Sequence, residues 1–217
     1  MMLVPIEFSD NIGEGEMREV KVGEGEKDKV LVSRYKGELY AVGAFCSHFG
    51  APLVEGVLFD DKVLCPYHAA GFSVVTGAVD SAPGLDGVPK YEIVKQGENF
   101  FVKVPEDGIK QQKQTMPLAK RDPNDKRNYV IIGGGAAGLN CAETLRQSGF
   151  TGKITLVSAE KKLPYDRTLL TKTLPFGDAT KFVLRDQAFL DGADIDVIND
   201  SVYAIHTDKK KVTFGRA

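Results

Sequence analysis

Cys46-Ser47-His48 and Cys65-Pro66-Tyr67-His68 are the two short stretches around which this sequence is organised, and 16 residues separate them. They contain two of the three cysteines and two of the three histidines in the 217-residue chain. Thiolate and imidazole are side chains that bind iron, zinc and copper in proteins. Because each stretch supplies one sulfur and one nitrogen donor, the sequence predicts a metal site built by two loops.

The mixed composition of each stretch bears on which metal is bound. If ligands sort by softness, Cys46 and Cys65 hold one iron while His48 and His68 hold the other, as in a Rieske [2Fe–2S] cluster. A structural zinc site also uses two cysteines and two histidines, but its motifs usually keep the cysteines together in one knuckle. We therefore predict an iron–sulfur site, with a zinc-stabilised binding module as the alternative.

The residues around both stretches resemble the Rieske ferredoxin-type domain. The string Cys46-Ser47-His48-Phe49-Gly50, the stretch 65–68 and the segment 72–77 follow its pattern. A Pro83-Gly84 turn stands where that family places the loop that covers the cluster. The resemblance implies an all-β fold, a [2Fe–2S] cofactor and electron transfer.

The resemblance also implies a low reduction potential. High-potential respiratory members of the family have a serine and a tyrosine that hydrogen-bond to the cluster, and a disulfide that joins the two loops. The corresponding positions here are Ala70 and Phe72, which cannot donate, and Ala51 and Tyr67, which cannot form a disulfide. We expect a ferredoxin-like potential near the bottom of the Rieske range, about −150 mV.

Composition limits the partners. Apolar residues make up 42% of the chain, charged residues 27%, and the net charge is −2. We expect no nucleic-acid partner and no membrane span, because there is neither a basic excess nor a long apolar run. The first 15 residues resemble no targeting segment, so we expect an intracellular protein, cytoplasmic or mitochondrial. Cys141, the third cysteine, is expected to be a small buried residue in a helix.

Three segments differ in their patterning. Residues 1–105 read as short strands separated by turns, which predicts an all-β Rieske domain. Residues 106–127 are rich in Lys, Gln, Asp and Pro without periodicity, so we expect a solvated linker, or alternatively an arm packed across the first domain. Residues 128–217 alternate strand and helix signals, which predicts a partial α/β Rossmann-type FAD-binding domain.

A dinucleotide-binding fingerprint opens the third segment. The apolar run 129–132, expected to be a strand covered on both faces, leads into a G-x-G-x-x-G motif and a helix. Gly133 would permit the tight turn, Gly135 would let a pyrophosphate approach, and Gly138 would allow helix and strand to pack closely. Glu160, 22 residues after Gly138, would accept hydrogen bonds from an adenosine ribose.

Residues 163–172 resemble the Pro-Tyr-x-Arg-Pro-x-Leu-Ser-Lys motif in the FAD domain of ferredoxin reductases and apoptosis-inducing-factor-like flavoproteins. The resemblance implies that Arg167 contacts the cofactor and that Lys172 lies near the flavin ring. Thr168 and Thr171 replace the usual proline and serine. Without the proline the local backbone is less fixed, which affects the placement of Arg167.

The whole chain resembles apoptosis-inducing-factor-like proteins that begin with a Rieske domain. That resemblance implies an FAD and [2Fe–2S] oxidoreductase, coupled in full-length relatives to NAD(P)H oxidation. Relatives continue beyond the point where this sequence ends, so we expect a truncated form with weak or no FAD binding. We predict no catalytic residue and expect at most an electron-transfer module for an unidentified redox protein. A cell-death signalling protein is the alternative suggested by the family name.

Overall fold

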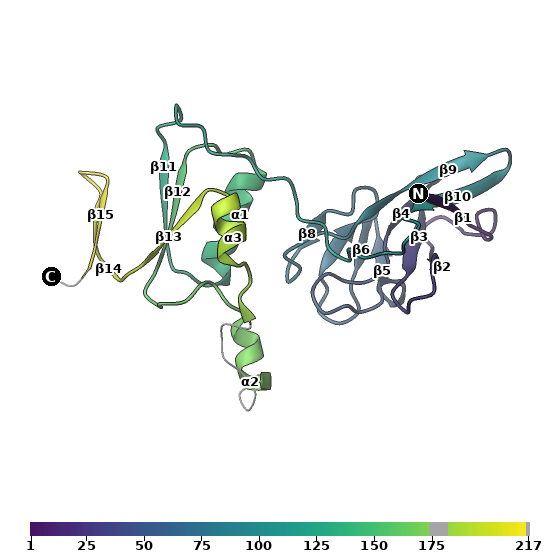
Figure 1. The fold of residues 1–217 in the computed structure, drawn as a ribbon, viewed down its shortest axis with the longest axis horizontal. Helices are drawn as coiled ribbons and strands as arrows, with labels where there is room; N and C mark the ends of the chain where they lie inside the picture. Colours follow the sequence, from purple (N-terminus) through teal and green to yellow (C-terminus); the bar gives the residue numbers. More distant parts are fainter. Residues whose placement is uncertain (174–181, 216–217) are drawn as a thin grey trace. The chain divides into compact units, whose positions relative to one another are not determined.

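Antiparallel strands build the first unit, Met1–Met116, of a computed structural model that describes residues 1–173 and 182–215 (Figure 1). Six strands form its larger sheet in the order β1-β10-β9-β4-β3-β2. Their bounds are β1 (Met2–Pro5), β2 (Met17–Lys21), β3 (Lys29–Tyr35), β4 (Glu38–Gly43), β9 (Lys90–Gln96) and β10 (Asn99–Val104). All six lie within residues 1–105, where the sequence predicted short strands separated by turns.

The turn between β3 and β4 shows how local sequence sets the register. Lys36 and Gly37 both have positive φ, at 52° and 79°, as the tightest hairpin turns require. Glu14 accepts hydrogen bonds from the backbone N–H groups of both residues. The turn therefore pairs Tyr35 with Glu38 and fixes the whole β3–β4 ladder.

A smaller sheet carries the second cysteine. Four antiparallel strands form it: β5 (Val57–Phe59), β6 (Lys62–Leu64), β7 (Gly71–Ser73) and β8 (Val79–Ser81). A short 3₁₀-helix, η1 (Leu53–Glu55), precedes it. The sequence did not predict β7 or β8. All three residues of β7 are buried, so this strand shows no alternation of apolar and polar positions. The stretch 65–70 connects β6 to β7.

The first unit buries two apolar clusters. One lies within the larger sheet around Val30, Val32 and Val102. The other contains both Cys46 and Cys65 together with neighbours from the smaller sheet, which are Leu53, Val63, Ala70, Phe72 and Val74. The metal-site cysteines are thus part of a hydrophobic core rather than of a surface loop.

Three parallel strands and three helices dominate the second unit, Pro117–Ala217. The sheet order is β11-β12-β13, and β14 and β15 form a separate antiparallel hairpin. Figure 1 shows α1 and α3 along the sheet, and their buried residues share one cluster with Ile154 and Leu156 of β12. The bounds are β11 (Asn128–Ile132), α1 (Ala136–Gln147), β12 (Lys153–Ser158), η2 (Arg167–Leu169), α2 (Leu170–Thr173), α3 (Gln187–Gly192), β13 (Ile195–Asn199), β14 (Val202–His206) and β15 (Lys211–Phe214).

Two expectations about burial in this unit were wrong. β11 is not the fully covered strand that we expected: Tyr129 and Ile132 are 50% and 49% exposed, and β11 stands at the edge of the described sheet in the order β11-β12-β13. Cys141 is exposed as well. The buried residues of α1 include Leu139 and Ala142, and helical geometry turns Cys141 to the opposite side.

Residues 106–127 differ from the solvated linker that composition suggested. The first part, an arm of residues 106–116, lies on the first unit. Ile109 is buried in the core of the larger sheet, and its backbone N–H donates to Asp28 Oδ1 at 3.0 Å. A single buried isoleucine among polar residues leaves no periodic signal, so the pattern of the sequence could not reveal this anchor.

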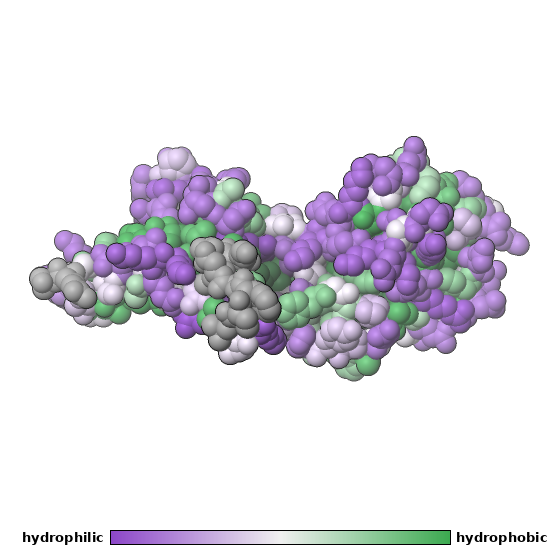
Figure 2. Space-filling model, turned by 60° about the horizontal axis from the view of Figure 1, so that its bottom comes forward, coloured by the Kyte–Doolittle hydropathy of each residue, from purple (hydrophilic) through white to green (hydrophobic). Residues whose placement is uncertain are grey.

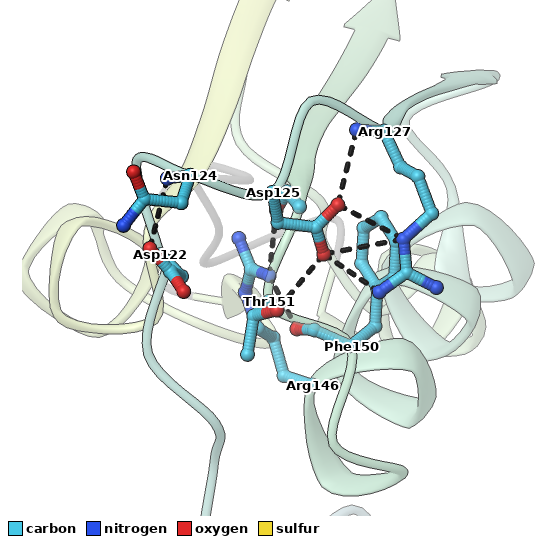
Figure 3. A network of polar contacts seen from close by, with 8 residues as sticks. Asp122, Asn124, Asp125, Arg127, Arg146, Phe150 and Thr151 are labelled. Atoms are coloured by element: carbon cyan, nitrogen blue, oxygen red, sulfur yellow. Dashed lines mark hydrogen bonds and ion pairs between the residues drawn. The ribbon is translucent and has the colours of Figure 1, made fainter.

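The second part of that segment lies on the second unit (Figure 3). The Asp122 N–H donates to the Thr151 carbonyl, and Thr151 Oγ1 donates to Asp125 Oδ2 at 2.8 Å. Arg127 forms an ion pair with Asp125 at 2.6 Å. Leu118 also packs against the core of the second unit, but most of the contacts of this part are polar, which is why its composition resembles that of a solvated segment.

Arg146 is the central polar anchor of the second unit, and its side chain is fully buried (Figure 3). Its guanidinium donates to four backbone carbonyls at 2.7–2.9 Å. The acceptors belong to Phe150, Gly152, Ala193 and Asp194. One side chain of α1 therefore joins the turn before β12 to the turn before β13.

Figure 2 shows a mostly hydrophilic surface with smaller hydrophobic areas on each unit. Within the described ranges, no helix has the length and apolar character needed to cross a lipid bilayer.

We predict that Arg146→Met lowers the free energy of unfolding of the second unit by about 3 kcal/mol, because four buried carbonyls lose their donor. Thermal unfolding followed by circular dichroism at 222 nm measures this unit selectively, since every α-helix of the described residues lies in it. Arg121→Met is the control, because that side chain is exposed. A destabilisation equal to that of the control would contradict the prediction.

Candidate metal centre

The two cysteine loops, residues 46–51 and 65–70, close with the same backbone hydrogen bonds. In the first loop, the Cys46 N–H donates to the Ala51 carbonyl at 2.9 Å and the Gly50 N–H donates to the Cys46 carbonyl at 2.8 Å. In the second, Cys65 donates to Ala70 at 2.9 Å and Ala69 donates to Cys65 at 3.0 Å. Each cysteine therefore occupies the first position of an equivalent turn.

The backbone conformation of the loops matches as well. The fifth residue of each has positive φ, +73° at Gly50 and +58° at Ala69. Glycine adopts this left-handed conformation without steric cost, whereas alanine is strained by about 1 kcal/mol. The second loop thus keeps its conformation against local preference, because the strands on both sides of it, β6 and β7, are paired with each other.

Both thiols lie in an apolar environment. Cys46 and Cys65 are 3% and 5% exposed. Burial raises the pKa of the Cys46 thiol, and the neighbouring Cys65 thiol raises it further, while the backbone N–H groups of His48 and Phe49 oppose the rise. Two adjacent buried thiolates repel each other, so a bound cation is what would stabilise them both.

The two imidazoles lie on the more exposed side of the site. His48 is half-buried and His68 is exposed, and their ring centroids are 5.0 Å apart. The Phe49 ring lies 4.0 Å from the His48 ring, and the Tyr67 ring lies 6.3 Å from the His68 ring. Neither aromatic residue was assigned a role from the sequence, although each is adjacent in sequence to a histidine.

The donors are grouped in pairs, thiol with thiol and imidazole with imidazole. Cys65 lies beside Cys46, and the ring centroids of His48 and His68 are 5.0 Å apart. A pairwise grouping is what ligand softness predicts for a two-iron centre. The donor set therefore fits a [2Fe–2S] cluster.

A third loop, residues 83–87, contacts the first cysteine loop. Ser47 Oγ donates to the Asp86 carbonyl at 2.6 Å, and both residues are buried. A Cβ added at Gly84 would lie 3.3 Å from Ser47 Oγ and equally close to the Phe72 ring, so only glycine fits there without displacement. The Pro83-Gly84 turn thus occupies the place that the sequence analysis gave it, against the loop that contains Cys46 and His48.

The glycine motif of the second unit has the expected strand–turn–helix setting. Gly133 has φ +120°, and its N–H donates to the Val157 carbonyl at 2.8 Å. A Cβ at Gly138 would lie 1.9 Å from the Gly133 carbonyl oxygen, whereas one at Gly135 would meet nothing within 4 Å. Gly138 is therefore required for packing, and the space at Gly135, beside the N-terminus of α1, is open.

The acid after β12 is already engaged. Glu160 forms an ion pair with Arg167, and its other carboxylate oxygen accepts a hydrogen bond from the Tyr165 hydroxyl at 2.8 Å. The structure thus brings Glu160 and Arg167 together and adds Tyr165, a residue that the sequence analysis did not single out. Lys172 lies in the short helix α2 with an exposed side chain.

Comparison with known families assigns both units. The family described as Rieske [2Fe-2S] domain matches residues 2–92, and the family described as pyridine nucleotide-disulphide oxidoreductase matches residues 127–216. The chain joins a Rieske domain to a pyridine nucleotide-disulphide oxidoreductase domain. The predicted family and fold class, an all-β Rieske domain followed by a partial α/β domain, are thus confirmed.

Relatives resemble the chain over one or both domains. Apoptosis-inducing factor 3 of Homo sapiens is 39% identical over 206 residues, which cover 92% of this chain and 33% of that protein. The chain therefore spans about a third of the length of such relatives. The 3-phenylpropionate/cinnamic acid dioxygenase ferredoxin subunit of Escherichia coli K12 is 39% identical over 71 residues, 32% of this chain and 67% of that protein.

A solved structure also resembles the Rieske domain. It is the ferredoxin of carbazole 1,9a-dioxygenase from Nocardioides aromaticivorans IC177, which is 28% identical and has a TM-score of 0.44. The similarity covers 48% of this chain and all of the ferredoxin.

We predict that Cys46→Ser abolishes the reddish-brown colour and the iron and sulfide content of the anaerobically reconstituted 217-residue chain, because one of the expected thiolate ligands is lost. Cys141→Ser is the matched control and should keep all three, since Cys141 is exposed and lies in the other unit. Metal analysis and visible absorbance measure both variants. A colourless wild-type protein that contains zinc would overturn the iron–sulfur assignment.

Proposed function

We propose that this chain is an electron-transfer module whose [2Fe–2S] cluster is held by Cys46, Cys65, His48 and His68. The observation that carries this proposal is the pair of equivalent cysteine loops, which present two buried thiols and two more exposed imidazoles. Electron paramagnetic resonance of the dithionite-reduced protein tests it. A signal typical of mixed nitrogen and sulfur ligation is expected, and a spectrum without it would contradict the proposal.

Each side chain has a separate task. A cluster bound here supplies one-electron chemistry. Cys46 and Cys65 would bind it on the buried side, where the apolar core excludes water. His48 and His68 would bind it on the exposed side, where their imidazoles would lie nearest to a redox partner. Phe49 and Tyr67 flank these rings and offer apolar surface to a protein partner.

We expect the reduction potential to lie near the bottom of the Rieske range, about −150 mV. Two thiolates in place of four leave the site about two charges less negative than in a four-cysteine ferredoxin. This difference raises the reduction potential of Rieske centres as a class. Within the class, hydrogen-bond donors near the sulfurs raise the potential. Ala70 and Phe72 are fully buried beside the loops and offer no side-chain donor.

We predict that Phe72→Tyr raises the midpoint potential, because a hydroxyl at the ring tip would lie near Ser47 and Gly84 and add a donor to the site. Protein-film voltammetry measures the shift. Phe100→Tyr is the matched control and should leave the potential unchanged, since Phe100 lies in β10 and packs against the core of the larger sheet. A strongly positive potential in the wild type would show that the assignment of Ala70 and Phe72 is wrong.

We also propose that the second unit supplies part of an FAD site. Gly133, Gly135 and Gly138 would place the N-terminus of α1 near the pyrophosphate. Glu160 would bind the adenosine ribose, and for this it must exchange its contacts with Arg167 and Tyr165. Arg167 and Lys172 would then contact the cofactor. In full-length relatives, NAD(P)H would supply the electrons.

We predict that the 217-residue chain binds FAD weakly or not at all. A doubly wound sheet holds its cofactor across strands of both halves, and the described residues contain three parallel strands. Flavin absorbance and fluorescence after purification in excess FAD, followed by dialysis, measure retention. Stoichiometric flavin that survives dialysis would contradict this expectation.

The domain limits, the partner and the compartment complete the proposal. We place the domains at residues 1–105 and 128–217, with residues 106–127 as a connector anchored to both. The partner would be a redox protein that exchanges single electrons.

The three cysteines, none of them in a disulfide, favour a reducing compartment, cytoplasmic or mitochondrial. Immunostaining of cells with organelle markers tests the compartment.

A further inference from the structure

The arm of residues 106–116 pairs with the loop 83–87 that lies against the first cysteine loop. Gly87 and Gln114 form an antiparallel bridge in which each N–H donates to the other's carbonyl, at 2.9 and 3.0 Å. On its other side Gly87 is packed against backbone: a Cβ added there would lie 2.3 Å from the Gly77 carbonyl oxygen. The loop is therefore fixed between the arm and the turn that contains Gly77.

A side-chain hydrogen bond next to this bridge connects the arm with the proposed metal centre. Thr115 Oγ1 donates to Asp86 Oδ1 at 3.1 Å. The carbonyl of the same Asp86 accepts the 2.6 Å hydrogen bond from Ser47 Oγ. Ser47 stands between Cys46 and His48 in sequence, so the contacts run without a gap from the arm to the first loop.

These hydrogen bonds matter for the position of the loop because the residues that form them are buried. Asp86 is 7% exposed and Ser47 is 5% exposed. A buried carboxylate needs hydrogen-bond donors, and losing one of them favours movement of the group toward water. Removing the Thr115 hydroxyl therefore favours a displaced Asp86, which would carry its carbonyl away from Ser47.

We propose that Thr115 and Gln114 are positioning residues of the metal centre, which hold the loop 83–87 and, through Asp86, the Ser47 hydroxyl in place. This inference rests on the proposed ligation by Cys46, His48, Cys65 and His68. The connector between the domains thereby also sets the environment of the first cysteine loop.

The expected effect has a definite direction. Displacement of the loop 83–87 would let water reach the site. The Ser47 hydroxyl would also lose its present acceptor, the Asp86 carbonyl, and could then donate to the metal centre instead. Reduction adds a negative charge to the site, and both water and a hydroxyl donor stabilise that charge. The midpoint potential of the variant should therefore become more positive, and its cluster should become more accessible to solutes.

The test uses the full 217-residue chain, reconstituted anaerobically with iron and sulfide. Thr115→Val should shift the midpoint potential to more positive values in voltammetry. It should also accelerate several-fold the loss of visible absorbance in EDTA. Thr115→Ser keeps the hydroxyl and should restore both values. The control is Thr213→Val, which changes an exposed threonine of β15 and should have no effect.

Gln114→Pro gives a second measurement, because proline removes the N–H that donates to Gly87. Its potential and rate of cluster loss should change in the same direction as those of Thr115→Val. If both variants keep the wild-type potential and rate of cluster loss, and also show the electron paramagnetic resonance signal of the reduced cluster, the inference is wrong. If the wild-type protein itself lacks that signal, the proposed function is wrong instead, so the two failures are distinguishable.

Discussion

Two buried thiols that face each other across equivalent turns impose the constraint on which the first domain depends. Cys46 and Cys65 both lie in the apolar core, where burial and their closeness to each other disfavour two thiolates. The proposed metal centre would resolve this conflict, because it would neutralise the sulfurs and join the loops at once. The smaller sheet, η1 and the loop 83–87 all surround this pair, so the architecture of the domain follows from holding two sulfurs together in a dry place.

The same constraint explains how the site is divided. The sulfur side belongs to the core, while His48 and His68 lie closer to solvent with Phe49 and Tyr67 beside them. In the proposed site the thiolates would thus face the interior, and the imidazoles would face the more exposed side, where a partner could approach. The contacts from Ser47 through Asp86 to Thr115 connect this site to the arm, and the chain then continues into the second domain.

The second domain is organised by polar anchors as much as by apolar packing. Arg146 joins two turns through four carbonyls, and the segment before β11 is held by Asp122 and Asp125. At the expected nucleotide site, the space at Gly135 is open and Gly138 packs closely on Gly133, but Glu160 already contacts Arg167 and Tyr165. The two proposed sites therefore differ: the cysteine loops already have equivalent closed conformations, whereas Glu160 would have to exchange partners before it could bind a ribose.

The sequence alone determined the two fold classes and pointed to the proposed metal site, because Cys-x-His, Cys-x-x-His and G-x-G-x-x-G are local patterns with local physical causes. It also placed most strands, since their apolar alternation is visible in short windows. Only the tertiary structure decided what depends on distant residues: the strands β7 and β8, the exposure of Cys141 and Ile132, the anchoring of Ile109 on Asp28, and the pairing of Gly87 with Gln114. Such contacts join residues far apart in the chain, and no local pattern records which partner a buried carboxylate or an isolated isoleucine will find.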